Sequence, residues 1–256
     1  MAALGGWIER NLPGIDNPCV DTHAKGGQAM LVENWMNRNV ITIDAKAPML
    51  EATKILKEHN IRMLPVLDRN KLVGVVTDRD LKRASPSDAT TLEVHELFYI
   101  TANMKVAEIM TKKPITVPFD YTVEEAAEIL LQNKISGVPV IDRDGTLVGT
   151  ITQTDIFRVL TSLTGMGRRG IQFGFLLEDR PGSIKEVADI IRKHGGRMRS
   201  ILSSYERAPE GFRHVYIRFY DADREAIPQL KQELKETAQV LYMVDHRDNI
   251  REIYVG

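Results

Sequence analysis

The stretch Gly74–Leu81, "GVVTDRDL", decides the fold, because its skeleton returns at Gly149–Ile156 as "GTITQTDI". In both copies a threonine stands three residues after the glycine, and an aspartate three residues after the threonine. A Thr-x-x-Asp pair is a capping box, which satisfies free N–H groups at the start of a helix. The same pair can also present a hydroxyl and a carboxylate to a ligand. The surrounding sequence has to decide between these interpretations.

The two copies belong to two longer, similar units. The units match at an offset of 74 residues up to their shared Pro-Val pair, and at an offset of 75 residues after the inserted Gly145. A skeleton repeated in the same context indicates a duplicated structural unit. The matched positions include Met36 with Met110, Thr42 with Thr116, Pro65 with Pro139, Gly74 with Gly149, Thr77 with Thr152 and Asp80 with Asp155.

The periodicity of each unit predicts an order of elements. A short β-branched run opens each unit and predicts a strand. Apolar residues then recur at helical spacing over 48–58 and 122–131, and Thr122 with Glu125 predicts a capping box at the second helix. Two further strand-like runs joined by a tight turn predict a hairpin, and a last helix follows. Each unit is therefore predicted to be strand–helix–strand–strand–helix.

Within this order, Thr77 and Thr152 end a strand at the start of a helix. Free N–H groups and the positive end of the helix dipole favour an anion at such a point. Gly74 and Gly149 are expected to leave room for a flat group to approach the backbone, since glycine has no side chain. This arrangement is compatible with a ligand site as well as with a capping box alone.

Two such units, each with Gly-x-x-Thr-x-x-Asp and an internal "LPV" or "VPV", closely resemble a tandem pair of CBS domains. The resemblance implies sheets packed face to face and adenosine ligands (AMP, ADP, ATP or S-adenosylmethionine) in clefts between the repeats. It implies a first nucleotide site at Thr42, Met63, Pro65, Thr77, Arg79 and Asp80, and a second at Thr116, Gly137, Val138, Pro139, Thr152 and Asp155.

The same resemblance implies roles for these residues. The two aspartates would hold ribose hydroxyls, the Thr-x-x-Asp threonines would contact phosphate or ribose, and Arg79 would add a charge-assisted contact to phosphate. We therefore expect a phosphorylated nucleotide to prefer the site of Asp80. The site of Asp155 has the small Gly137 where the first unit has Met63, so it is expected to suit a nucleoside-like ligand.

The last third of the chain predicts a separate domain. After a glycine-rich break, "DRPGSI" at Asp179–Ile184 lies between a predicted strand and a helix, and the order strand–helix–strand–strand–helix–strand follows. This ferredoxin-like βαββαβ pattern resembles an ACT domain, which implies pairing into a shared sheet and amino-acid binding at the turn, here Gly182 and Ser183. Good turn chemistry alone also explains this sequence. Arg197 stands where amino-acid-binding members often carry asparagine.

The predicted fold class is α/β (α+β). The predicted segments are a loose tail (1–29), CBS repeat 1 (30–83), a helical connector (84–105), CBS repeat 2 (106–160), a linker (161–169), the ACT domain (170–248) and a C-terminal tail (249–256). A CBS pair followed by an ACT domain resembles the acetoin-utilisation AcuB-type regulatory family. That resemblance implies a setting in acetoin or central carbon metabolism.

Composition excludes several other classes of function. The net charge of −1 gives no support to a nucleic-acid or membrane-surface partner. No apolar run approaches the roughly 20 residues that span a bilayer, and the single Cys19 fits a reducing cytoplasm. The six histidines lack metal-ligand spacing, and no catalytic motif is present. A non-enzymatic, cytoplasmic protein with no metal and no catalytic cofactor is expected.

The sequence therefore predicts a regulatory sensor of adenine nucleotides or S-adenosylmethionine. It is expected to form a homodimer or higher homo-oligomer through its ACT domain and to act on a protein target that the sequence does not identify. Two alternatives remain open. One is an amino-acid sensor that acts through Gly182 and uses the CBS pair as a scaffold; the other is a purely structural interaction module in which Thr77 and Asp80 only cap a helix.

Overall fold

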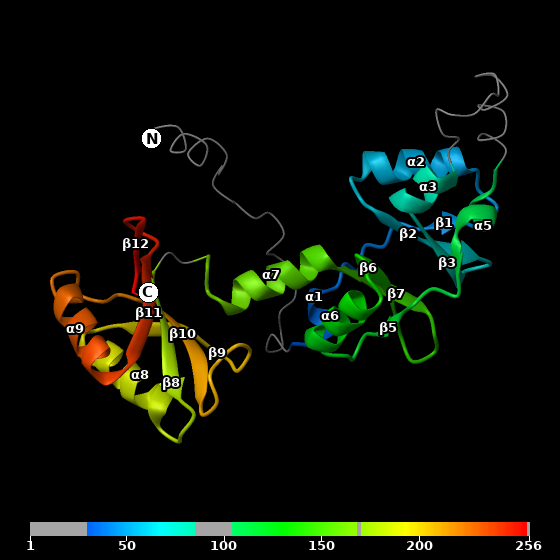
Figure 1. Ribbon diagram of the computed structural model, residues 1–256. Helices are drawn as coiled ribbons and strands as arrows, with labels where there is room; N and C mark the ends of the chain where they lie inside the picture. The colour runs from blue at the N-terminus through cyan, green and yellow to red at the C-terminus, as the bar shows by residue number, and fades with distance from the viewer. Residues whose placement is uncertain (1–29, 85–103, 168–169, 255–256) are drawn as a thin grey trace.

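The computed structural model describes residues 30–84, 104–167 and 170–254. The predicted tail (1–29) and nearly all of the predicted connector lie outside these ranges. The described residues form two α/β units and a C-terminal α/β domain (Figure 1). The predicted fold class is confirmed.

The first unit has the predicted order of elements, with shorter first strands. It contains α1 (Val32–Trp35), β1 (Ile43–Asp44), α2 (Met49–Glu58), β2 (Met63–Asp68), β3 (Lys71–Thr77) and α3 (Asp78–Ala84). β1 runs parallel to β2, and β2 pairs with β3 as an antiparallel hairpin. The turn of this hairpin places Arg69 and Asn70 at positive φ, which is typical of a two-residue loop.

The second unit repeats this plan. It contains α5 (Val106–Ile109), β4 (Thr111–Lys112), β5 (Val117–Pro118), α6 (Val123–Gln132), β6 (Gly137–Ile141), β7 (Leu147–Thr152) and α7 (Gln153–Leu163). The capping box predicted at α6 is present, since Glu125 N donates to Thr122 Oγ1 over 3.2 Å and Thr122 N donates to Glu125 Oε2 over 2.7 Å.

The two units exchange their leading segments. Val32 of α1 is buried in the core of the second unit, and Val106 of α5 is buried in the core of the first. Asn37 pairs with Thr150 of β7 through two backbone hydrogen bonds, and β4 pairs with β3. The short elements α1, α5 and β4 were not predicted, because they acquire their partners only from the other unit.

This exchange corrects the role expected for Gly74 and Gly149. A Cβ atom at Gly74 would lie 2.6 Å from Met110 Sδ and 2.9 Å from the backbone oxygen of Thr111. A Cβ atom at Gly149 would meet the side chain of Met36 in the same way. These glycines make room for the exchanged segment, and not for a flat ligand.

The C-terminal domain is a five-stranded antiparallel sheet with two helices. It contains β8 (Ile171–Glu178), α8 (Ser183–Lys193), β9 (Arg197–Ser204), β10 (Phe212–Tyr220), α9 (Ile227–Thr237), β11 (Gln239–Asp245) and β12 (Ile250–Ile253), with strand order β12-β11-β8-β10-β9. The order of the first four strands and two helices is ferredoxin-like. The C-terminal tail predicted at 249–256 was wrong in part, because β12 extends the sheet beside β11.

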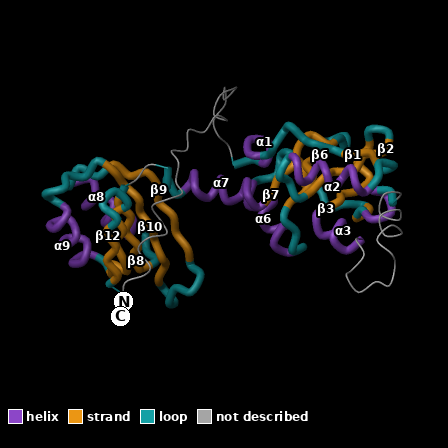
Figure 2. The backbone as a smooth tube through the Cα atoms, turned by 90° about the horizontal axis from the view of Figure 1, so that it is seen from above, coloured by secondary structure: helices purple, strands orange, loops and turns teal. Residues whose placement is uncertain are grey.

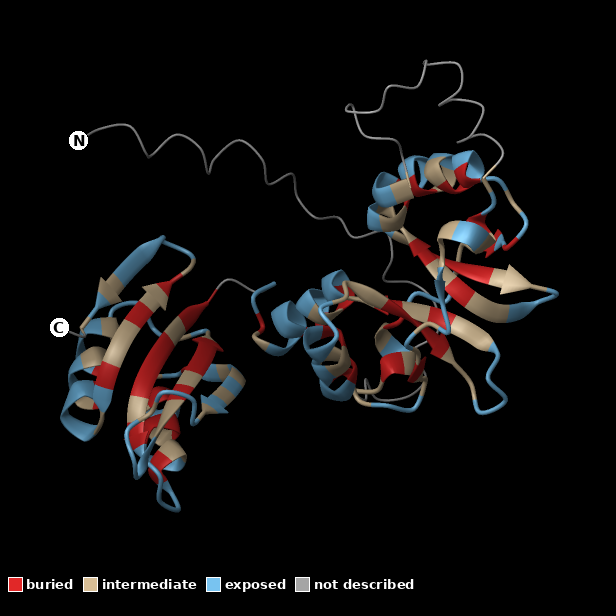
Figure 3. Cartoon of the chain, turned by 45° about the vertical axis from the view of Figure 1, so that its right-hand side comes forward, coloured by how far each residue is buried: buried red, intermediate tan, exposed pale blue. Residues whose placement is uncertain are grey.

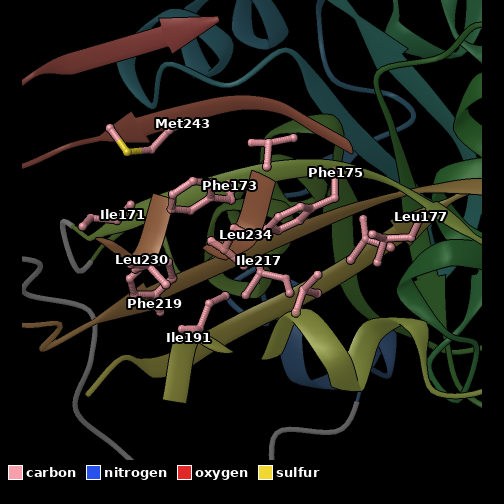
Figure 4. Packing of buried hydrophobic residues seen from close by; sticks show 13 residues of the cluster. Ile171, Phe173, Phe175, Leu177, Ile191, Ile217, Phe219, Leu230, Leu234 and Met243 are labelled. Atoms are coloured by element: carbon pink, nitrogen blue, oxygen red, sulfur yellow. The ribbon is translucent and has the colours of Figure 1, made fainter. Parts of the chain in front are cut away.

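Alternate residues of β8, β10 and β11 point to the helices and form the core of this domain. Phe173 and Phe175 of β8 and Phe219 of β10 are fully buried with Leu230 and Leu234 of α9 (Figure 4). In Figure 3 the buried residues of this domain are concentrated in the strands at the middle of the sheet. The intervening strand residues lie on the opposite face of the sheet, which neither α8 nor α9 covers.

Helix α7 lies between the CBS-like units and the C-terminal domain in both views of the chain (Figures 1 and 2). It starts directly after Thr152 and ends at Leu163. At its far end, Ser200 of β9 donates a 3.0 Å hydrogen bond from Oγ to the backbone oxygen of Thr164. One helix therefore connects the end of β7 to the C-terminal sheet.

Candidate functional site

A cleft of about 450 Å³ lies where the two repeats meet. This volume falls within the usual range for small-molecule sites. The first repeat and its leading segment contribute the apolar residues of the cleft, Val40, Ile41, Ile61, Met63 and Pro65, together with Asn37, Asn39, Asn60 and Arg62. The second repeat contributes polar residues: Ser136, Thr150, Thr152, Gln153, Thr154 and Asp155, with Gly137. The apolar side chains of the cleft thus come from the first repeat, whereas the second repeat contributes almost only polar ones.

The polar side of the cleft is the start of α7. Thr152 donates to Asp155 Oδ2 from Oγ1 over 2.7 Å and from N over 2.9 Å, and Asp155 N donates back to Thr152 Oγ1 over 3.4 Å. The second carboxylate oxygen, Oδ1, accepts from Arg158 Nη1 over 2.8 Å. Asp155 is only 8% exposed, yet it lines the cleft. The Thr-x-x-Asp pair is therefore a helix cap and part of a cleft at once.

The hairpin and the following helix are joined at the cleft in both repeats. Gln153 N donates to the backbone oxygen of Ser136 over 2.9 Å, and Asp78 N donates to that of Arg62 over 3.3 Å. These bonds hold the first turn of each helix beside the start of the hairpin. In the second repeat, the bond from Gln153 holds the N-terminal end of α7, which is the positive end of its dipole, at the cleft.

Arg62 is the basic side chain that lines the cleft. It is exposed, and within the described ranges it forms no ion pair. An arginine with no carboxylate partner, on the same cleft as a helix N-terminus, favours an anionic group between them. The sequence motifs did not assign a role to Arg62.

The structure combines residues that the prediction had divided between two sites. Met63 and Pro65, expected with Asp80, line the cleft together with Gly137, Thr152 and Asp155. The cleft is not lined by the other predicted site residues, which are Thr42, Thr77, Arg79, Asp80, Thr116, Val138 and Pro139. Of these, Val138 is buried in the core of the second repeat.

Thr77 and Asp80 nevertheless reproduce the geometry of Thr152 and Asp155. Asp80 Oδ2 accepts from Thr77 Oγ1 over 2.7 Å and from Thr77 N over 2.9 Å. The duplicated motif is therefore built alike in both repeats. The roles predicted for Arg79 and Asp80 in a nucleotide site stay predictions.

A second cavity, of about 230 Å³, lies in the C-terminal domain at the predicted turn. Ser183 lines it, is almost fully buried, and accepts a 3.2 Å hydrogen bond from Arg213 Nη2. Gly182 has φ of 92°, a conformation that glycine adopts without strain, and it does not line the cavity. On one side of the cavity, Arg180 forms a bidentate ion pair with Glu186, in which both hydrogen bonds measure 2.7 Å. These hydrogen bonds from Arg180 lower the pKa of the Glu186 carboxyl.

Two other classes of function require a metal centre or a membrane span. In residues 30–84, 104–167 and 170–254, no group of three or more His, Cys, Asp or Glu side chains could hold a metal ion. Among the helices in these ranges, none combines the length and the apolar character that a membrane span requires.

The model of the CBS domain matches the chain twice, at residues 32–87 and 106–162. A CBS domain-containing protein of Dictyostelium discoideum is 32% identical over 132 residues, which cover 51% of this chain and 91% of that protein. The chain belongs to the family of CBS domain proteins, and its two repeats form a tandem CBS pair.

Other relatives share only this part. The inosine-5'-monophosphate dehydrogenase of Korarchaeum cryptofilum is 36% identical over 125 residues, which cover 49% of this chain but only 23% of the dehydrogenase. Among solved structures, a CBS domain pair in complex with 5'-methylthioadenosine and S-adenosyl-L-methionine is 35% identical, with a TM-score of 0.42 over 51% of this chain and 98% of that one.

Proposed function

We propose that this protein is a non-catalytic regulator that senses an adenosine-containing ligand in the cleft between its CBS repeats. The observation that carries the proposal is the composition of that cleft. Apolar residues from the first repeat, the Thr152–Asp155 pair and the start of α7 all border one space of about 450 Å³. This combination matches the three parts of a nucleotide: base, ribose and phosphate.

Each part of the ligand has a complementary group. The adenine ring would pack against Val40, Ile41 and Met63, where its flat faces displace water from apolar surface. Ribose hydroxyls would donate to the carboxylate of Asp155, which accepts hydrogen bonds only. A phosphate would lie between the first turn of α7 and the guanidinium of Arg62.

This arrangement supports the opposite preference of the two sites. Arg79 led us to expect a phosphorylated nucleotide at Asp80, whereas Arg62 lines the cleft of Asp155. We therefore place AMP, ADP or ATP at Asp155, with S-adenosylmethionine as an alternative adenosine ligand. S-adenosylmethionine carries a positive sulfonium in place of phosphate, so Arg62 would oppose it.

The C-terminal domain is proposed to be an ACT-type domain that relays the signal through a homodimer. Support comes from its ferredoxin-like order of strands and from the long edge strand β9, which pairs with β10 on one side. An edge strand of eight residues is a template for pairing with a second copy. The protein target and the setting in acetoin or central carbon metabolism remain proposals from the order of the domains.

The second cavity favours one alternative function. An amino acid could occupy the space of about 230 Å³ beside Ser183, with the CBS pair as a scaffold. Its ammonium group would meet Glu178 or Glu186, and its carboxylate would meet Arg180. The existing pair of Arg180 with Glu186 would have to open first, which is why we rank this function second.

Calorimetric titration of the purified protein with AMP, ADP, ATP and S-adenosylmethionine tests the proposal. We expect binding that Asp155→Ala abolishes, while Asp80→Ala identifies any contribution of the first repeat. Binding lost only in Asp80→Ala would move the site to the first repeat. A parallel titration with amino acids tests the alternative sensor, which heat from amino acids alone would support. No heat from the adenosine ligands or from amino acids would support a structural module.

A further inference from the structure

The uncovered face of the C-terminal sheet contains a buried arginine. Ile217 and Phe219 of β10 point into the core, so Arg218 between them lies on the opposite face. Arg218 is nevertheless only 4% exposed. In the register of the sheet it lies beside Ser200 of β9 and Gln172 of β8.

This guanidinium has no anionic partner in the part of the chain that the structure describes. Nη2 donates to the neutral Oε1 of Gln172, whose amide in turn donates to the hydroxyl of Tyr242 over 2.9 Å. Nε and Nη1 are buried and have no hydrogen-bond acceptor among the described residues. A buried charge without a counter-charge is costly, so an anion beside this guanidinium would offset that cost.

Two carboxylates, one at the end of β11 and one in the turn that follows it, are already engaged. Asp245 accepts from Arg224 Nη1 and, over 2.9 Å, from the backbone N–H of Arg247. Asp248 accepts from the same Arg224 nitrogen over 2.9 Å. Arg218 binds neither of these acids, so its charge has no carboxylate partner among the described residues.

Further basic groups lie along the same row of the sheet. Gln172 is opposite Val244, and Val244 is opposite Arg251 of β12, so Arg218 and Arg251 lie at the two ends of a row with two residues between them. The imidazole of His246 is close enough for both guanidinium groups to lower its pKa, with burial as the largest cause. His246 is half-buried and Arg251 is exposed, so both basic side chains can be reached from solvent.

We propose that this face binds a small oxyanion, a carboxylate or a phosphate group, at Arg218, with Arg251 and His246 at the entrance. The anion supplies the acceptors that Nε and Nη1 lack. Its negative charge offsets both guanidinium groups. The site is separate from the CBS cleft and does not depend on the function proposed for that cleft.

Thermal unfolding in inorganic phosphate and in succinate, each compared with chloride at equal ionic strength, tests this site. We expect either oxyanion to raise the unfolding temperature of the wild type, because a ligand of the folded state stabilises it. Arg218→Met should lose this response and should unfold at a higher temperature than the wild type in chloride, since it removes an unpaired buried charge. Arg207→Gln, which removes an exposed positive charge elsewhere, should keep the full response.

Two further measurements separate this site from others. Asp155→Ala should respond like the wild type, whereas a lost response would place the anion in the CBS cleft. In the wild type, saturating phosphate should raise the His246 pKa by about one unit, followed by NMR, because a bound anion favours the imidazolium. An unchanged His246 titration, or equal stabilisation of Arg218→Met, would overturn the proposal.

Discussion

Met110 lies against Gly74 so closely that a Cβ atom built on the glycine would come within 2.6 Å of the methionine sulfur. Met110 belongs to the segment that leads into the second repeat, and Gly74 belongs to the hairpin of the first. The same relationship joins Met36 to Gly149 in the opposite direction. Glycine at these points is therefore a condition for the two repeats to exchange segments.

Gly74→Ala is expected to destabilise the CBS pair by about 1–3 kcal/mol, the usual cost of overpacking. The methionine can move, but the backbone oxygen of Thr111, which would lie 2.9 Å from the added Cβ atom, cannot move without disturbing β4. Urea unfolding measures the effect. Gly167→Ala is the control, because a Cβ there would meet nothing within 4 Å, and its stability should be unchanged or slightly higher.

Thr152→Ala separates capping from ligand binding. The variant loses an N-cap, which costs about 1 kcal/mol, and also a group of the cleft. Thr122→Ala removes a matched capping box at α6, outside the cleft. We expect similar losses of stability in both variants but weaker nucleotide binding only in Thr152→Ala. Equal affinity in the two variants would contradict the proposed site.

Arg62→Gln is expected to weaken AMP binding about tenfold, in line with the loss of a charged hydrogen bond, and to leave adenosine binding nearly unchanged. The difference isolates the contact with phosphate. Arg69→Gln, in the exposed hairpin turn of the same repeat, should bind both ligands like the wild type. Calorimetry with the paired ligands provides the comparison. A parallel loss for AMP and adenosine would assign Arg62 to the base or the ribose.

The depressed pKa of His246 predicts a loss of stability in acid. Burial and the two arginines lower this pKa below its ordinary value of 6.5 in the folded state. The unfolded chain therefore binds the proton more readily, and the contribution of neutral His246 declines as the pH falls through 6.5 and then through the lower folded pKa. Between about pH 7.5 and 5, the urea midpoint should fall less in Arg251→Gln than in the wild type, because this variant removes one of the charges that lower the His246 pKa. A steeper fall would contradict this assignment.

Ile201→Lys tests the proposed pairing of β9. Ile201 is 42% exposed on the edge strand, and lysine at an edge opposes pairing with another strand. Sedimentation should show a dimer for the wild type and a monomer, or a weaker dimer, for the variant. A dimer of unchanged strength would place the contact elsewhere on the chain.

The sequence predicted the elements of each repeat well, because the duplication shows every pattern twice. The hairpins, the capping box at Thr122 and the ferredoxin-like order all follow from local periodicity and turn chemistry. The exchange of α1 and α5 could not be predicted, because local patterns do not indicate which repeat a short segment packs against. β12 was missed because Ile250–Ile253 is too short to show a period.

The exchange also explains what the sequence missed in the site. Thr152 and Asp155 were predicted from the motif, and both line the cleft. The prediction grouped Thr152 and Asp155 only with residues of the second repeat, whereas Met63 and Arg62 reach the cleft from the first repeat. Arg62 stands just before the internal "MLPV", so a search for basic residues beside that sequence would have found it.

The length of helix α7 determines how far its C-terminal end moves when its first turn tilts. Its 11 residues span about 16 Å, so a tilt of about 10° at Thr152 would displace the far end by about 3 Å. That displacement is about as long as the hydrogen bond from Ser200 to Thr164, which measures 3.0 Å. A rearrangement too small to alter the shape of the CBS pair would thus be enough to break or form a specific contact with β9.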